Sequence, residues 1–169
     1  MGLNEILLVI AALIPAITLA VYIYIKDRAD KEPVGLLLIL LVCGVLSCFP
    51  ASFIESWIYE IINAVFGVTT DVPVFASGLT NIMYQISTNF FGIALVEEGL
   101  KWIILFFITR KNKNFNSLFD GIIYAVFVSL GFAGFENILY VLDYGWATAI
   151  SRAIMSVPGH TFFAVIMGY

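Results

Sequence analysis

Charged side chains are scarce in this sequence. Asp, Glu, Lys and Arg make up 12% of its 169 residues, whereas hydrophobic residues make up 62%. A water-soluble domain needs far more charged surface than this composition provides. The scarcity of charge therefore excludes an ordinary soluble domain and predicts a single integral membrane domain over residues 1–169.

The sequence also lacks a run of basic residues, a basic segment before the first apolar run, and two cysteines spaced so that they could form a pair. Without a run of Lys and Arg, we expect no nucleic-acid partner. Cys43 and Cys48 are the only cysteines, and their spacing puts them on different helix faces, so we expect buried thiols rather than a disulfide or metal pair. No Lys or Arg precedes the first apolar segment, so we expect an uncleaved first helix rather than a signal peptide.

Long apolar runs dominate what is present. A helix needs about 20 apolar residues to cross the hydrocarbon core of a bilayer. We therefore expect an all-α fold, a polytopic transmembrane helix bundle of about five spans. The predicted spans are residues 4–25, 34–54, 79–109, 118–142 and 147–169.

Apolar residues at helical spacing continue beyond the second predicted span. They are Ile54, Trp57, Ile58, Ile61, Ile62 and Val65, and Glu55, Ser56, Glu60 and Asn63 lie between them. This amphipathic pattern predicts an interfacial helix over about 54–66, lying along the membrane surface or capping the bundle.

Basic residues concentrate in two of the predicted loops. Six of the eight Lys and Arg residues lie in loops 26–31 and 110–113, and the segment 55–78 has none. The positive-inside rule then places both basic loops in the cytoplasm and the N-terminus outside, in a multi-pass protein of the cell membrane.

A few titratable side chains interrupt the predicted spans. They are Glu97, Glu98, Lys101, Glu136, Arg152 and His160. Each charged one costs on the order of 3 kcal/mol at the centre of a spanning helix. These groups could simply pair and hold the bundle together, but their spread over three successive helices favours a functional site.

Two adjacent glutamates lie in the third predicted span. Glu97 and Glu98 precede Lys101 by four and three residues, so the ammonium can neutralise one carboxylate. The other must hold a proton or find another cation. A carboxylate that exchanges a proton readily is what water activation requires. Because adjacent helical residues point about 100° apart, we expect the two glutamates to have different roles.

Small residues surround the titratable groups of the last two spans. Gly131 and Gly134 permit close approach of a neighbouring helix just before Glu136 and Asn137. In the last span, Pro158-Gly159 predicts a break in the helical ladder directly before His160, the only histidine. Such breaks are tolerated where the backbone lines a polar cavity.

Three motifs in this order resemble the PrsW family of intramembrane proteases. They are Glu97-Glu98-x-x-Lys101, Phe132-x-x-x-Glu136-Asn137 and Pro158-Gly159-His160, and Asp120-Gly121 and Arg152 also fit. The resemblance covers about residues 95–169. The family is similar to the wider group of CAAX prenyl endopeptidases and bacteriocin-processing membrane proteases, in which Arg stands at the place of Lys101 and His at that of Glu136.

The resemblance implies a membrane-embedded peptidase. Its implied substrates are single-pass membrane proteins such as anti-sigma factors, cut in a regulated cascade. The apolar run is unfinished at Gly168-Tyr169, whereas family members usually continue through further spans, so we expect a short or truncated member.

On this hypothesis, water attacks the peptide bond directly and no acyl-enzyme forms, because no Ser or Thr stands in a nucleophile–His–acid pattern. Glu97 is the expected base, held ionised by Lys101. Glu98 would orient the water or bind a metal. Glu136 would be a second acid, a metal ligand or a proton shuttle.

The remaining candidates would stabilise charge. His160 would stabilise the oxyanion or protonate the leaving amine, with Asn137 as a hydrogen-bond donor and Arg152 as a charge partner. A Zn²⁺ site formed by Glu98, Glu136 and His160 is chemically compatible, and the sequence does not separate it from a purely glutamate-and-histidine site.

Two other functions stay open at the level of sequence. Buried Glu, Lys and His could form the relay of a proton-coupled transporter or channel, although the sequence shows no inverted repeat. Alternatively, the chain could be a non-catalytic membrane scaffold whose charges only specify how the helices pair.

Overall fold

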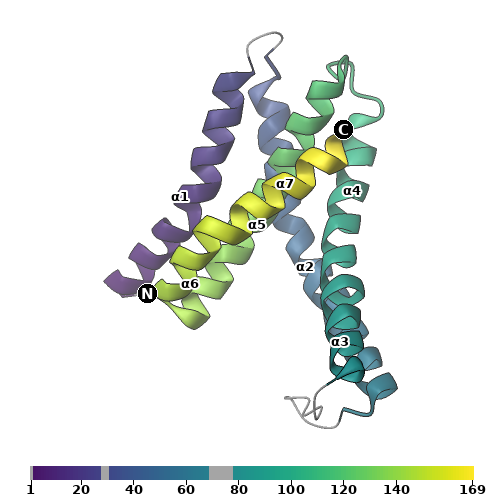
Figure 1. Ribbon diagram of the computed structural model, residues 1–169. Coiled ribbons are helices and arrows are strands. Elements are labelled where there is room, and N and C mark those ends of the chain that lie inside the picture. Colours follow the sequence, from purple (N-terminus) through teal and green to yellow (C-terminus); the bar gives the residue numbers. More distant parts are fainter. Residues whose placement is uncertain (1, 28–30, 69–77) are drawn as a thin grey trace. The chain divides into compact units, whose positions relative to one another are not determined.

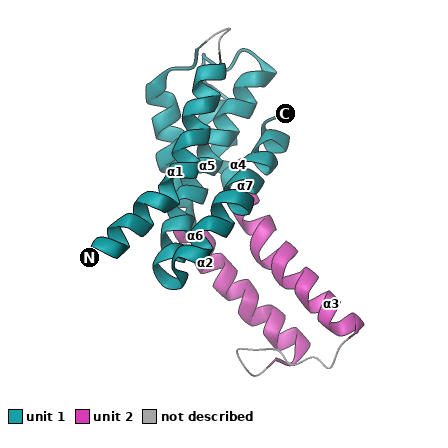
Figure 2. Ribbon diagram, turned by 60° about the vertical axis from the view of Figure 1, so that its left-hand side comes forward, with its two compact units in different colours: residues 1–48, 101–169 teal, residues 49–100 magenta. Residues whose placement is uncertain are grey.

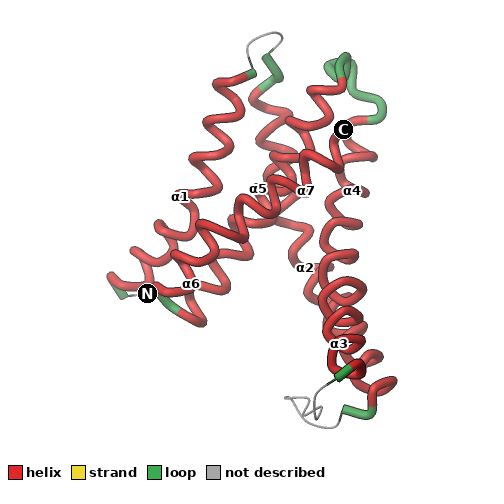
Figure 3. Tube along the Cα trace, in the orientation of Figure 1, coloured by secondary structure: helices red, strands yellow, loops and turns green. Residues whose placement is uncertain are grey.

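The computed structural model describes residues 2–27, 31–68 and 78–169. These residues form helices joined by short loops, and no strand occurs among them (Figure 3). The predicted all-α fold is confirmed. Arg28, which belongs to the basic loop 26–31 of the predicted topology, lies outside the described residues, as do residues 69–77.

Nearly all residues of each predicted span are helical, and α2 continues beyond its predicted end at 54. Their order is α1 (Leu3–Lys26), α2 (Val34–Phe66), α3 (Leu79–Ile86), η1 (Ser87–Ala94), α4 (Leu95–Thr109), α5 (Leu118–Tyr144), α6 (Trp146–Ser151), η2 (Arg152–Ser156) and α7 (Val157–Gly168) (Figure 1). The segments η1 and η2 are π-helical, whereas the others are α-helical.

Within the described residues, four helical segments are long and apolar enough to cross a membrane. They are α1, α2, α5 and the continuous segment Trp146–Gly168. The chain is therefore a multi-pass membrane protein. Residues 79–109 are helical throughout but are not among the four, and they contain the charged residues Glu97, Glu98 and Lys101. That fifth span stays a prediction.

The predicted interfacial helix is not a separate element. Residues 54–66 form the last part of α2, which continues through Pro50 over 33 residues. At 1.5 Å per residue, such a helix is about 50 Å long, more than the roughly 30 Å of the hydrocarbon core. Part of α2 must therefore tilt or project, and the interfacial position of residues 54–66 stays a prediction.

The described chain divides into two compact units, where the sequence suggested one membrane domain. Unit 1 comprises residues 1–48 and 101–169, and unit 2 comprises residues 49–100 (Figure 2). In unit 2, the Tyr84 hydroxyl donates to Asn63 Oδ1 at 2.8 Å, and the Tyr84 ring meets Phe66 edge-on. These contacts hold α3 against the end of α2.

Helix α5 is the central helix of unit 1. Nearly all its residues from Asp120 to Gly134 are buried, and they pack against α1, α2 and α7. Two glycines allow this packing. A Cβ on Gly44 would lie 2.0 Å from the Val128 carbonyl oxygen, and one on Gly131 would lie 2.1 Å from that of Leu41. The predicted close approach at Gly131 is thus present, and its partner is α2.

Polar residues fix the start of α5. Ser117 caps the helix, and its hydroxyl donates to Asp120 Oδ1 at 2.6 Å. One turn later, the buried Tyr124 hydroxyl donates to Glu32 in the segment before α2. Burial raises the pKa of the Glu32 carboxyl, and the neighbouring Asp120 and Asp27 add to that rise. This end of unit 1 therefore holds three buried acidic side chains.

Candidate active site

Glu136 and His160 meet although they lie on different helices. His160 Nε2, on α7, lies 3.1 Å from Glu136 Oε2, on α5. Both side chains are mostly buried, since 13% of the His160 side chain and 17% of the Glu136 side chain are exposed. The packing of α7 on α5 brings these two residues together.

Arg152 contacts Glu136 of this pair and its neighbour Asn137. Its Nη2 lies 2.6 Å from Glu136 Oε2, and its Nε donates to Asn137 Oδ1 at 2.7 Å. The guanidinium also lies over the Tyr140 ring, 4.1 Å from its centroid. Arg152 thus binds two consecutive residues of α5 with two nitrogens, a geometry that lysine cannot reproduce.

Lys101 reaches the other side of the imidazole. Its Nζ lies 3.1 Å from His160 Nδ1 and 3.9 Å from the centroid of the Phe132 ring, and the residue is completely buried. An ammonium group has only donors, so a charged Lys101 requires His160 Nδ1 to accept. The imidazole hydrogen then sits on Nε2 and is directed at Glu136. The sequence had indicated Glu97 or Glu98 as the partner of Lys101, and contact with His160 was not foreseen.

Two further residues position this cluster without having been predicted to do so. The buried Ser129 hydroxyl donates to the backbone carbonyl of His160 at 2.9 Å, and the Phe132 ring lies 5.8 Å from the imidazole, centroid to centroid. Ser129, Phe132 and Glu136 have the spacing i, i+3, i+7, which places them on one helix face. That spacing is the signal in the sequence that could have identified them.

Both polar atoms of the Asn137 side chain form hydrogen bonds. Its Oδ1 accepts from Arg152, and its Nδ2 lies 3.4 Å from the backbone carbonyl oxygen of Ala12 on α1. Only 1% of its surface is exposed. The side chain therefore ties α1 to α5 and orients Arg152. Its predicted role as a donor to an oxyanion has no support from these contacts and stays a prediction.

Glu97 and Glu98 lie in the first turn of α4 and belong to unit 2, whereas Lys101, Glu136, Arg152 and His160 belong to unit 1. Within α4, the two carboxylates precede Lys101 by about one helical turn. Their meeting with Glu136 and His160 stays a prediction.

A π-helical segment precedes each of two predicted motifs. η1 ends directly before α4, and η2 carries Arg152 and ends directly before α7. In η2, the Val157 N–H bonds the carbonyl of Arg152, five residues back. The predicted break at Pro158-Gly159 is absent, since α7 continues through both residues. The irregularity instead lies one turn earlier. π-helical turns often occur at functional sites, where they redirect side chains.

Comparison with known proteins identifies the family. The family described as PrsW family intramembrane metalloprotease matches residues 32–169, most of the chain. The chain belongs to the PrsW family. It is 36% identical to Protease PrsW of Geobacillus kaustophilus over 96% of its own length and 64% of that protein's length. It is 35% identical to Protease PrsW of Bacillus subtilis, over 94% and 65%, and 33% identical to that of Clostridioides difficile, over 96% and 63%.

The chain spans about two thirds of the length of these PrsW relatives. No solved structure matches it significantly. The match begins at residue 32, so it includes all three motifs of the PrsW resemblance and leaves out only α1 and the segment after it.

The description of the PrsW family as metalloproteases raises the question of whether these side chains suit a metal ion. Zinc binds carboxylate oxygen and imidazole nitrogen at about 2.0–2.2 Å, which places two such donors about 3.3 Å apart in tetrahedral geometry. The 3.1 Å between His160 Nε2 and Glu136 Oε2 fits this requirement, but zinc would need an Nε2 without hydrogen, which is the opposite of the tautomer inferred from Lys101. A catalytic zinc site needs three protein ligands, and unit 1 supplies these two.

Proposed function

We propose that this chain is a membrane-embedded peptidase that hydrolyses peptide bonds of membrane-anchored substrates with a water molecule activated by a glutamate. The observation that carries this proposal is the cluster of Glu136, His160, Arg152 and Lys101, buried between helices apolar enough to span a membrane. Ionised groups at such depth cost several kcal/mol each unless they are paired, and typically mark functional sites.

We assign water activation to Glu97, supported by Glu98. Helix α4 is continuous from Leu95 to Thr109, and its Lys101 contacts His160. Glu97 and Glu98 lie one turn before Lys101 on this helix, so they are near in sequence to a residue that contacts the imidazole. Charge also supports the assignment. Lys101 and Arg152 carry two positive charges and Glu136 carries one negative charge, so the net positive charge of these three residues favours an ionised glutamate nearby.

The roles of the unit 1 residues follow from their hydrogen bonds. Glu97 would take a proton from water as the oxygen attacks the carbonyl carbon of the peptide bond. The C–N bond then breaks, and the leaving amine needs a proton. Glu97 would pass the proton that it took from water to the leaving amine, and His160 would stabilise the oxyanion with the hydrogen on Nε2. Lys101 and Arg152 would hold His160 and Glu136 in place and offset the negative charge that develops.

A metal ion is an alternative to this role of His160, because an Nε2 atom that binds zinc carries no hydrogen. Glu136 and His160 would hold a zinc ion together with Glu98 as the third ligand. Such an ion, when bound, polarises a carbonyl group and makes bound water more acidic. Glu97 would then remain available as the base.

The substrates and the topology belong to the same proposal. The PrsW family resemblance suggests single-pass membrane proteins of the anti-sigma-factor type as substrates, cleaved as one step of regulated proteolysis. We propose that the chain lies in the cell membrane with its N-terminus outside and with the loops 26–31 and 110–113 in the cytoplasm, because these loops hold most of the Lys and Arg residues.

Replacement of the two glutamates tests the proposal. The chain is co-reconstituted with a single-pass membrane substrate, and cleavage is followed by the appearance of the two fragments. Glu97→Gln should lower the cleavage rate by about 10²–10⁴-fold, the usual contribution of a general base. Glu98→Gln should lower it as well. Glu60→Gln, the same chemical change at an exposed position of α2, is the matched control and should cleave normally.

The same preparations distinguish the alternatives. Normal cleavage by Glu97→Gln would contradict the assignment of the base. Proton or solute flux without cleavage in the wild-type chain would favour a transporter or channel. Loss of folding in every glutamate variant, measured by thermal unfolding in detergent, would favour a scaffold. Inhibition by a chelator that added Zn²⁺ reverses would support the metal site, and metal-free purified protein with full activity would exclude it.

A further inference from the structure

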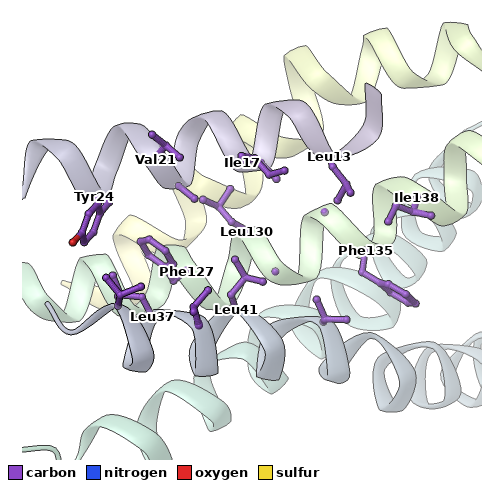
Figure 4. A pocket seen from close by; sticks show the side chains of 17 residues that line it. Leu13, Ile17, Val21, Tyr24, Leu37, Leu41, Phe127, Leu130, Phe135 and Ile138 are labelled. Carbon is purple, nitrogen blue, oxygen red and sulfur yellow. The ribbon is translucent and has the colours of Figure 1, made fainter. Parts of the chain in front are cut away.

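An apolar groove runs along unit 1 between α1, α2 and α5. Its volume is about 330 Å³, within the roughly 300–1,000 Å³ of typical ligand pockets. Seventeen residues line it, and Tyr24 has the only polar side chain among them (Figure 4). Tyr24 lies at one end of the groove, and Leu13 and Ile138 lie at the other.

The groove lies on the opposite face of α5 from the candidate active site. Its α5 residues include Phe127, Gly134 and Ile138, whereas Ser129 and Glu136 carry the active-site contacts. At about 100° per residue, these two sets point roughly 180° apart. The groove therefore does not lead to the Glu136–His160 pair, and a peptide held in it would not be presented for cleavage.

The length of the groove matches one leaflet of a bilayer. From Leu13 to Tyr24, α1 rises about 17 Å, whereas half of the hydrocarbon core is about 15 Å thick. A transmembrane helix of a partner or of a second copy would need a face along the full core. A single acyl chain needs only one leaflet. The rim is open to lipid, since Ile17, Val21 and Leu38 are 56%, 50% and 55% exposed.

Positive charge lies at the Tyr24 end. Lys31 Nζ lies 5.0 Å from the centroid of the Tyr24 ring. Among the described residues, two acidic ones are near in sequence, and both are buried and turned toward other partners, whereas Asp30 lies outside the described residues. Glu32 accepts from Tyr124, and Asp27 accepts from the backbone of Glu32. A basic side chain at the mouth of an apolar, leaflet-length groove is the arrangement that an anionic lipid requires.

We propose that this groove binds one acyl chain of an anionic phospholipid, from the leaflet on the side of the segment that joins α1 and α2. The chain lies between α1 and α2 over α5, and the phosphate lies beside Lys31 and the Tyr24 hydroxyl. This site is independent of the proposed peptidase activity.

Lipid retention tests the proposal. The chain is reconstituted into bilayers with equal amounts of phosphatidylglycerol and phosphatidylcholine, extracted in a mild detergent, and analysed by native mass spectrometry. We expect one retained phosphatidylglycerol per chain. Lys31→Gln should lower the preference for phosphatidylglycerol about fivefold, the contribution of one basic residue at a membrane surface. Lys26→Gln is the matched control, because Lys26 lies over Tyr22, which is outside the groove.

A second pair of variants addresses the acyl chain. Ile17→Trp fills the groove from its rim and should abolish retention, whereas Ile14→Trp should keep it. Ile14 and Ile17 are similarly exposed, at 55% and 56%, but only Ile17 lines the groove. Thermal unfolding midpoints establish that each variant is folded.

Three results would overturn the proposal. The first is equal retention by the Ile17→Trp and Ile14→Trp variants. The second is an equal effect of Lys31→Gln and Lys26→Gln on the lipid preference. The third is a dimer in the wild-type spectrum that Ile17→Trp dissociates, which would show that a second copy occupies the groove.

Discussion

His160 Nε2 lies 3.1 Å from Glu136 Oε2, and this contact joins two motifs that are 24 residues apart in the chain. Each partner is held by a cation. Arg152 binds the carboxylate at 2.6 Å, and Lys101 lies 3.1 Å from the other nitrogen of the imidazole. A histidine fixed on both nitrogens has one tautomer and one orientation.

Loss of the Glu136 carboxylate should abolish peptide cleavage without unfolding the protein. Glu136→Gln keeps an oxygen that accepts from His160 but removes the charge opposite Arg152, so we expect the rate to fall by about 10²–10⁴-fold. Asp143→Asn is the matched control on the same helix, since Asp143 is exposed. Cleavage by Glu136→Gln at the wild-type rate would remove Glu136 from the site.

Arg152→Lys should also impair cleavage, because one ammonium cannot bind both Glu136 and Asn137 in the geometry of a guanidinium. Loss of one charge-assisted hydrogen bond costs about 1.5–3 kcal/mol, so we expect kcat/KM to fall by about tenfold or more. The measurement is a double-mutant cycle with Asn137→Ala. Coupling predicts that the combined variant loses less than the product of the two single effects. Independent effects would show that Asn137 does not orient Arg152.

Much of the fold follows from the sequence because membrane spans depend on local composition. Long apolar runs predict α1 and α5 to within a few residues, since a helix in lipid must satisfy its own backbone. The boundary of α2 was less predictable. Its residues 54–66 have the amphipathic pattern of a separate helix, but no residue there stops the helix, and Pro50 is accommodated within it.

The sequence predicts which residues belong to the site but not which of them contact one another. Glu136 and His160 stand out because ionisable groups are costly in a span. Their distance depends on how α5 crosses α7, which hydropathy does not encode. The contact of Lys101 with His160 was missed because helical spacing indicates only partners on the same helix, such as Glu97. The π-helical segment η2 was missed because Pro158 suggested a break at its own position.

Gly131 should be essential for the packing of α2 on α5. A Cβ at this position would lie 2.1 Å from the Leu41 carbonyl oxygen, and backbone atoms cannot move aside as a flexible side chain can. We expect Gly131→Ala to lower the free energy of unfolding by about 1–3 kcal/mol or more. Gly35→Ala on α2 is the control, because nothing lies within 4 Å of the added Cβ. Equal unfolding midpoints for both variants in detergent would contradict this packing.

Glu32 should make the stability of the fold depend on pH. Burial raises the pKa of its carboxyl above the ordinary value of 4.5, and the Asp120 and Asp27 carboxylates raise it further, while the hydrogen bond from Tyr124 opposes them. A carboxyl with a higher pKa in the folded state binds its proton more tightly there than in the unfolded state. The free energy of unfolding therefore falls as the pH rises from about 4.5 through the folded pKa, and this contribution is constant above it.

Two variants on opposite sides of that hydrogen bond test this dependence. Glu32→Gln has no proton to lose but still accepts from Tyr124, so its unfolding midpoint should fall less between pH 4.5 and 8 than that of the wild-type chain. Tyr124→Phe removes the interaction that lowers the pKa of Glu32, so the fall should extend to higher pH. Parallel curves for the wild-type chain and Glu32→Gln would show that other groups cause any pH dependence of folding.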